Sequence, residues 1–85
     1  MQNRQAITIL AALAQESRLA VYRLLVEHAP EGLAASAIAE KLGLPNATLS
    51  FHLKELMHAG LVLQERDGRN LIYRASIDRM SALMD

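Results

Sequence analysis

The chain has 85 residues, a formal net charge of zero, 52% hydrophobic residues and no cysteine. A chain of this length has room for one domain, so we expect residues 1–85 to form a single unit. The lack of cysteine excludes disulfides and thiolate metal sites within these residues. No apolar run reaches the roughly 18 residues of a membrane span, and the N-terminus lacks a signal-peptide pattern. We therefore expect a cytoplasmic protein without membrane contact.

The first segment, residues 3–14, is typical of a helix with apolar side chains on both sides. Ile7 lies on one face, whereas Ile9 and Leu13 lie on the other. A helix that is apolar nearly all round is normally covered on every side, and in so small a domain this indicates a partner subunit. The residues expected at a dimer interface are Ile7, Ile9, Leu10 and Leu13 of this helix, with Met80, Leu83 and Met84 of a last helix over residues 77–85.

A second helix is expected over residues 18–28, with Ser17 as its N-cap. Its apolar stripe contains Val21, Leu24, Leu25 and His28 or their neighbours. The proline and glycine of residues 29–32 then predict a loop.

Two short helices joined by a tight turn come next. The first covers residues 35–42 and is followed by Gly43, in the position of a helix C-cap. The second helix begins at Pro45 and runs to about residue 59. Proline suits this start because the first helical residue needs no partner for a backbone N–H. This pair is typical of a helix-turn-helix, whose second helix enters the major groove of DNA.

The second of these helices has an outer face suited to base contacts. With Leu49, Leu53 and Leu56 buried, the residues expected to contact DNA are Asn46, Ala47, Thr48, Ser50, Phe51, His52 and Lys54. An outward phenylalanine loses hydrophobic stabilisation unless something covers it, and a thymine methyl group in the major groove is a suitable cover. The alternatives are that Phe51 packs under the following hairpin or stays exposed. His52 borders the core side, where it can cap, pack or reach a phosphate.

Alternating segments over residues 61–66 and 69–75 predict a β-hairpin with Asp67–Gly68 as its two-residue turn. That turn places Arg66 opposite Arg69, and like charges in this position are destabilising unless an anion lies between them. A DNA phosphate would supply the anion, with Asn70 adding a hydrogen bond. The alternative is that both arginines extend into solvent.

The same pairing places Leu63 and Ile72 on one face, where they are expected to anchor the hairpin to the core. Arg74 lies near the base of the hairpin. It can reach a phosphate or pair with a carboxylate of the scaffold, and the sequence does not separate these two roles.

Three blocks in order resemble the ArsR/SmtB family of winged-helix repressors. They are ALAQESRLAVYRLL from residue 12, which includes Arg18, IAEKLGLPNATLSFHLKELMHAGLV from residue 38, and RDGRNLIYR from residue 66. The resemblance implies a mainly α winged helix-turn-helix with a small β-hairpin wing, in the order α-α-α-α-β-β-α. It also implies a homodimer formed by the first and last helices, a palindromic DNA operator, and repression relieved by an inducer.

Departures from the family pattern concern the sensing sites. The family's Cys–x–Cys metal or arsenite pair corresponds here to Ala34 and Ser36, and the last helix offers Asp78 and Asp85 without the histidine of the family's zinc site. We therefore expect no metal site and no cofactor in these residues. The residues do not identify the inducer, and arsenite or a metal ion is a candidate only if ligands lie beyond residue 85. The family's usual arginine before the histidine is Phe51 here, and Pro45 stands where the helix cap is often serine.

Two other classes of function can be compared with DNA binding. The net charge of zero favours a winged-helix module that binds a protein partner instead of DNA, with Phe51 as its central contact. An enzyme is not expected, because the chain offers no nucleophile–base pair, no paired carboxylates and no phosphate-binding glycine loop.

Overall fold

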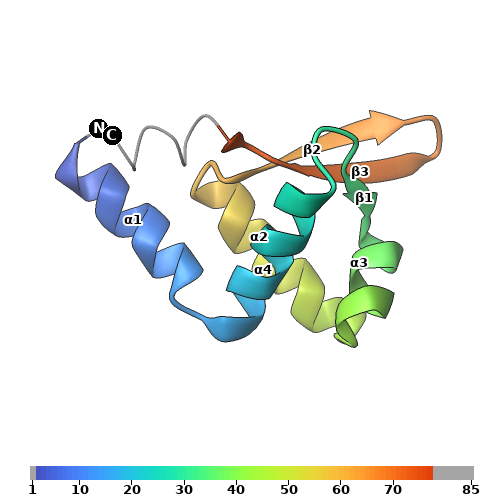
Figure 1. Ribbon diagram of the computed structural model, residues 1–85, viewed down its shortest axis with the longest axis horizontal. Coiled ribbons are helices and arrows are strands. Elements are labelled where there is room, and N and C mark those ends of the chain that lie inside the picture. The colour runs from blue at the N-terminus through green and yellow to red at the C-terminus, as the bar shows by residue number, and fades with distance from the viewer. Residues whose placement is uncertain (1, 78–85) are drawn as a thin grey trace.

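The structure is a computed structural model that describes residues 2–77. Its elements are α1 (Asn3–Leu13), α2 (Glu16–Glu27), β1 (Leu33–Ala34), α3 (Ala35–Leu42), α4 (Asn46–His58), β2 (Val62–Asp67) and β3 (Asn70–Ala75). Helix α1 lies at one end of the molecule and the tip of the β2–β3 hairpin at the other (Figure 1). The mainly α class with a small β wing is confirmed. The last helix expected over residues 77–85, with Met80, Leu83 and Met84, falls in residues 78–85, which lie outside the described part of the chain.

Helix α2 begins earlier than expected. Its N-cap is Gln15, whose side-chain Oε1 accepts a hydrogen bond from the backbone N–H of Arg18 at 2.7 Å. Ser17 lies inside the helix, so its prediction as the cap was wrong. A glutamine is a less common cap than serine, but its amide oxygen satisfies the same free N–H group of the first turn.

The first helix of the helix-turn-helix, α3, has the predicted bounds, residues 35–42. Gly43 adopts φ +65°, the left-handed conformation that ends a helix at little cost for glycine, and its N–H donates to Ala39 O. Pro45 has an extended conformation and is the N-cap of α4, one residue before the helical position expected for it. Helix α4 therefore starts at Asn46 and packs across both α2 and α3.

The core is mainly aliphatic, with Tyr22 and Tyr73 as its aromatic members, and lies between the helices and the inner face of the sheet. Its fully buried large side chains are Ile9, Val21, Leu25, Ile38, Leu49, Leu53, Leu56, Leu61 and Val62. The predicted stripe Leu49, Leu53 and Leu56 of α4 is thus confirmed. In α2 the buried residues are Val21, Tyr22 and Leu25, because the inner face is rotated slightly toward Tyr22.

Strand β1 was not expected, and it adds a third strand to the sheet in the order β1-β3-β2, with both pairings antiparallel. A strand of two residues is too short to show the alternation of apolar and polar side chains by which a strand is recognised in a sequence. Gly32 precedes β1 with φ +79° and lies directly against strand β3. Its close approach lets Leu33 and Ala34 pair with β3.

The turn of the β2–β3 hairpin lies one residue later than predicted, so each residue of β2 pairs with a partner two residues further along β3 than expected. Asp67 pairs with Asn70, so the two turn residues are Gly68 and Arg69. Only Gly68 has positive φ, which fits a turn with glycine at its first central position. Arg66 consequently lies opposite Leu71, and the expected Arg66–Arg69 pair does not form.

Leu63 and Ile72 still lie on one face of the hairpin, as predicted, but the opposite face is the one that packs on the core. Leu63 pairs with Arg74 and Ile72 with Glu65, and Leu63 is 53% exposed. Leu63 therefore does not anchor the hairpin as expected. That role belongs to Val62 and Tyr73, which are buried on the opposite face. Over residues 2–77, no helix combines the length and apolar character needed to cross a membrane.

Candidate nucleic-acid interface

The outer face of α4 carries most of the side chains expected to contact DNA. Those exposed there are Asn46, Ala47, Thr48, Ser50, Phe51 and Lys54. Phe51 is 54% exposed, so it does not pack under the hairpin, one of the alternatives considered for it. Short polar groups, one aromatic ring and one ammonium group thus share one face of α4. The left-handed conformation of Gly43 ends α3 shortly before this helix begins. Such a face can donate and accept hydrogen bonds at base edges and contact a thymine methyl group.

His52 does not lie on this outer face. It is only 5% exposed, and its Nδ1 accepts a hydrogen bond from Arg18 Nε at 3.4 Å. Its inclusion among the DNA contacts was therefore wrong, and packing is the role the structure assigns to it. The neutral imidazole carries its proton on Nε2 in this arrangement. Arg18 and His52 are 34 positions apart, and no local sequence signal links them.

Burial lowers the pKa of His52 below its usual value of 6.5, and the nearby Arg18 cation lowers it further. The folded protein thus holds this imidazole neutral at a pH where the unfolded chain would protonate it. We expect the free energy of unfolding to fall as pH drops through about 6.5 toward the lowered folded pKa. Thermal melts at about pH 7.5 and 5.5 measure this loss. His52→Gln should lose much less stability between these pH values, whereas His58→Gln, at an exposed site, should behave as wild type. Equal losses in wild type and His52→Gln would contradict the assignment.

The wing presents its cations at the exposed end of the hairpin. Arg69 lies in the turn, and Arg66 precedes the Asp67–Asn70 pair that closes the turn. Arg66, Arg69 and Asn70 are all exposed. Asp67 is also exposed at this tip. Because the two arginines are not directly opposite, their mutual repulsion is smaller than the predicted register implied. They remain able to contact separate phosphate groups.

Arg74 has a structural role at the base of the wing. Its Nη2 lies 3.2 Å from Glu65 Oε2, and its Nη1 donates to Glu65 Oε1 at 3.3 Å. On the other face of the hairpin, Gln64 Nε2 donates to the hydroxyl of Tyr73 at 2.8 Å. These two cross-strand contacts hold the observed register. Of the two roles open for Arg74, the structure supports pairing with a carboxylate.

The first helix exposes part of its apolar surface. Ile7 is 66% and Leu10 57% exposed, so both side chains are available to a partner subunit. Ile9 is 1% exposed and belongs to the protein's own core, so it cannot contact a partner as expected. Leu13 is half-buried against the same core.

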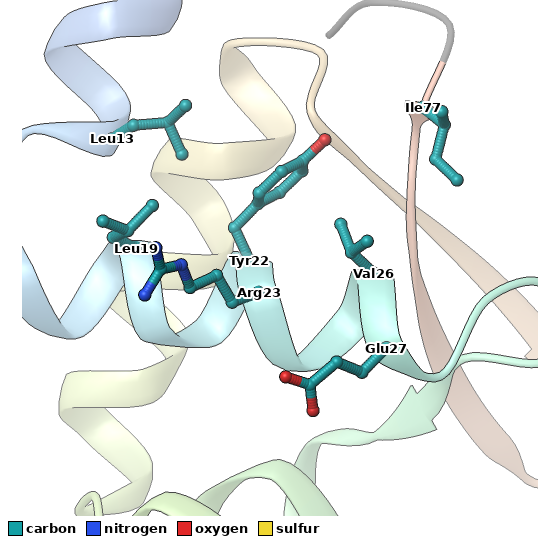
Figure 2. Close-up of a pocket in the computed structure, with 7 residues that line it drawn as sticks. All are labelled: Leu13, Leu19, Tyr22, Arg23, Val26, Glu27 and Ile77. Atoms are coloured by element: carbon teal, nitrogen blue, oxygen red, sulfur yellow. The ribbon is translucent and has the colours of Figure 1, made fainter.

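A shallow groove of about 540 Å³ runs between α1, α2 and Ile77 (Figure 2). The Tyr22 ring lies between Leu13 and Leu19 on one side and Val26 and Ile77 on the other. Burial raises the pKa of Tyr22, and its hydroxyl has no hydrogen-bond partner among residues 2–77. Within the same residues, no group of three histidine, aspartate or glutamate side chains is arranged to hold a metal ion.

Comparison with known proteins places this arrangement in a family. A helix-turn-helix domain family matches residues 13–65, more than half of the chain. The nodulation protein NolR of Rhizobium meliloti is 34% identical over 79 residues, a match that covers 93% of this chain and 62% of that protein. The chain therefore spans less than two thirds of the length of NolR.

Two solved structures have the same fold over 95% of the chain. An ArsR-like transcriptional regulator from Rhodococcus sp. RHA1 superposes with a TM-score of 0.84 at 26% identity, with 74% of that chain covered. The homodimeric winged helix-turn-helix DNA-binding domain of a possible ArsR-family regulator from Mycobacterium bovis superposes with a TM-score of 0.80 at 32% identity, with 73% covered. By its domain match, its fold and these relatives, the chain belongs to the ArsR/SmtB family of winged helix-turn-helix transcriptional regulators.

Proposed function

We propose that this protein is a sequence-specific transcriptional repressor that binds a palindromic DNA operator as a homodimer. The observation that carries the proposal is the exposed face of α4, where Asn46, Thr48, Ser50, Phe51 and Lys54 stand outward. Base edges and thymine methyl groups are the natural partners of such side chains. Arg66 and Arg69 of the wing supply phosphate contacts that position the helix without specifying sequence.

A net charge of zero does not oppose this function, because the local arrangement of cations matters more than their sum. Lys54, Arg66 and Arg69 are exposed, and the carboxylate of Glu65 is paired with Arg74, so Asp67 is the acidic group left beside the two arginines at the wing tip. Contacts with phosphates release counterions, and this release makes DNA affinity depend steeply on salt. A surface that bound a protein through Phe51 would lack this dependence.

The test is a titration of binding against salt. A duplex selected from a randomised library serves as the DNA, and the slope of log affinity against log salt is measured for wild type and for Arg66→Ala/Arg69→Ala. Each lost phosphate contact should reduce the slope by about 0.9, counted in both protomers. Arg74→Gln is the matched control, because its guanidinium is already paired with Glu65, and its slope should stay unchanged. An unchanged slope in the double variant would remove the wing from the interface. Salt-independent binding would favour a protein partner.

The dimer is proposed from the exposed Ile7 and Leu10 of α1 and from the homodimeric state of the Mycobacterium bovis relative. The second element of the interface would be the segment with Met80, Leu83 and Met84, beyond the described residues. A symmetric dimer presents two copies of α4 to two half-sites related by the same two-fold axis. This symmetry is the reason for expecting a palindromic operator.

Release by an inducer is proposed from the family alone. Ala34 and Ser36 stand at the positions of the family's cysteine pair, and neither offers a thiolate. We expect arsenite or Zn²⁺ added to residues 1–85 to leave the DNA complex intact, because a thiolate is the required arsenite ligand and no three-residue metal group exists within residues 2–77. Fluorescence anisotropy of labelled DNA measures this directly. Dissociation at micromolar arsenite or zinc would show that other residues of the chain sense these ions.

A further inference from the structure

Arg18 connects three helices around the aromatic residue of α4. Its Nε donates to His52 Nδ1 at 3.4 Å, and its Nη1 donates to the carbonyl oxygen of Ala12 at 3.4 Å. Its Cζ lies 5.5 Å from the centroid of the Phe51 ring. Arg18 itself is in the first turn of α2, so one guanidinium group joins the end of α1, the start of α2 and the middle of α4.

This arrangement orients the guanidinium before any ligand arrives. Two hydrogen bonds from a planar group restrict its rotation, and Arg18 is half-buried. A cation above an aromatic ring is attracted to the ring's negative face. The oriented cation thus favours one position of the Phe51 ring, while 54% of that side chain stays exposed.

We propose that Arg18 is a positioning residue for DNA sequence recognition, holding the Phe51 ring outward so that it packs on the 5-methyl group of a thymine. The inference rests on the DNA-binding function proposed above. A ring already held in place loses less conformational freedom on binding than one that must first leave the protein surface. The specificity of α4 for thymine at one position then depends on a residue of α2 that does not touch the base.

Two of the five N–H donors of Arg18 are engaged inside the protein and its Cζ lies over the Phe51 ring, so internal contacts set the position of the guanidinium. The substitution Arg18→Lys would keep the positive charge, but a single ammonium group cannot make both hydrogen bonds and stay above the ring. This variant should therefore weaken thymine recognition and leave the salt dependence of binding unchanged. Arg23→Lys, at an exposed position of the same helix, is the matched control.

The experiment replaces each thymine of the selected duplex in turn with deoxyuridine, which lacks only the 5-methyl group. For wild type, one position per half-site should lose about three- to fivefold in affinity, the value of burying one methyl group. Phe51→Ala should lose this methyl effect at the same position. Arg18→Lys should also lose most of it, with an overall affinity about three- to tenfold lower than wild type. Arg23→Lys should keep the full effect.

A measurement on the free protein tests the contact without DNA. Phe51 is the only phenylalanine of the chain, so biosynthetic incorporation of 4-fluorophenylalanine gives a single ¹⁹F resonance. Its chemical shift should move in Arg18→Lys and stay unchanged in Arg23→Lys, with both variants folded by circular dichroism. An unmoved resonance in Arg18→Lys would overturn the contact.

The DNA results separate the two proposals. Salt-dependent binding without any methyl effect in wild type, or a full methyl effect in Arg18→Lys, would overturn the role of Arg18 and leave the repressor function standing. Absence of salt-dependent binding by wild type would overturn both. Arg18→Gln, which removes the charge, should leave the salt slope unchanged, and a lower slope in that variant would show instead that Arg18 contacts a phosphate.

Discussion

Replacing Gly32 with alanine is expected to destabilise the protein more than the same replacement at Gly43 or Gly68. The new Cβ would lie 2.5 Å from the backbone oxygen of Tyr73 and 2.7 Å from Arg74 Cγ. Relief of the first contact requires movement of β3 away from β1, because a backbone oxygen cannot rotate aside. Added to this is the strain of φ +79° for a residue with a side chain. Together these effects should cost about 2–5 kcal/mol.

Gly68→Ala is the matched control for this prediction. Gly68 also has positive φ, at +65°, but a Cβ there meets nothing within 4 Å. The control therefore carries the backbone strain alone, about 1–2 kcal/mol. Thermal melts at equal protomer concentration should show Gly32→Ala with a Tm lower than Gly68→Ala by about 4–8 °C for each further kcal/mol. Similar Tm values for the two variants would show that β3 moves freely and that β1 pairing adds little stability.

The second large effect concerns α1 and DNA affinity. We expect Ile7→Gln/Leu10→Gln to convert a dimer into a monomer, because both side chains are more than half exposed and the substitution removes the apolar surface that a partner would cover. A monomer binds one half-site without the help of a linked second one. Its operator affinity should fall by about 10²–10⁴, the usual gain from joining two binding units.

Analytical ultracentrifugation and anisotropy on the selected duplex measure both consequences together. Leu63→Gln is the control, since Leu63 has similar exposure, at 53%, but lies in β2, far from α1 in the sequence. Circular dichroism should show native helix content in all variants, because neither Ile7 nor Leu10 belongs to the core. A dimer that persists in the double variant would place the interface on another surface. Full affinity in a monomeric variant would argue against a palindromic operator.

The helix-turn-helix was predictable because its signals are local. The left-handed conformation at Gly43 is inexpensive only for glycine, so α3 ends there whatever surrounds it. The spacing of Leu49, Leu53 and Leu56 indicated which side of α4 is buried, and therefore which side faces outward. The exposed residues of α4 were identified correctly from this period, apart from His52 on its border.

The sheet was predicted less well because its determinants are distant in the chain. Either Asp67–Gly68 or Gly68–Arg69 makes an acceptable two-residue turn, and the two choices shift the cross-strand partners by two residues while keeping the same side chains on each face. In the folded protein, Gln64 lies directly opposite Tyr73 and donates a hydrogen bond to its hydroxyl, a contact that favours the observed pairing. Strand β1 depends on the close approach of Gly32 to β3, which no sequence window reveals.

The sequence by itself determined the winged helix-turn-helix architecture, the family and the outward face of α4. Tertiary packing alone decided that Ile9 faces the core while Ile7 and Leu10 stay exposed, that Arg74 pairs with Glu65, and that His52 turns inward. The physical reason is that helical periodicity and glycine conformation act over a few residues. Contacts such as Arg18 with His52 and Phe51 join positions more than thirty residues apart, and they exist only once the helices have packed.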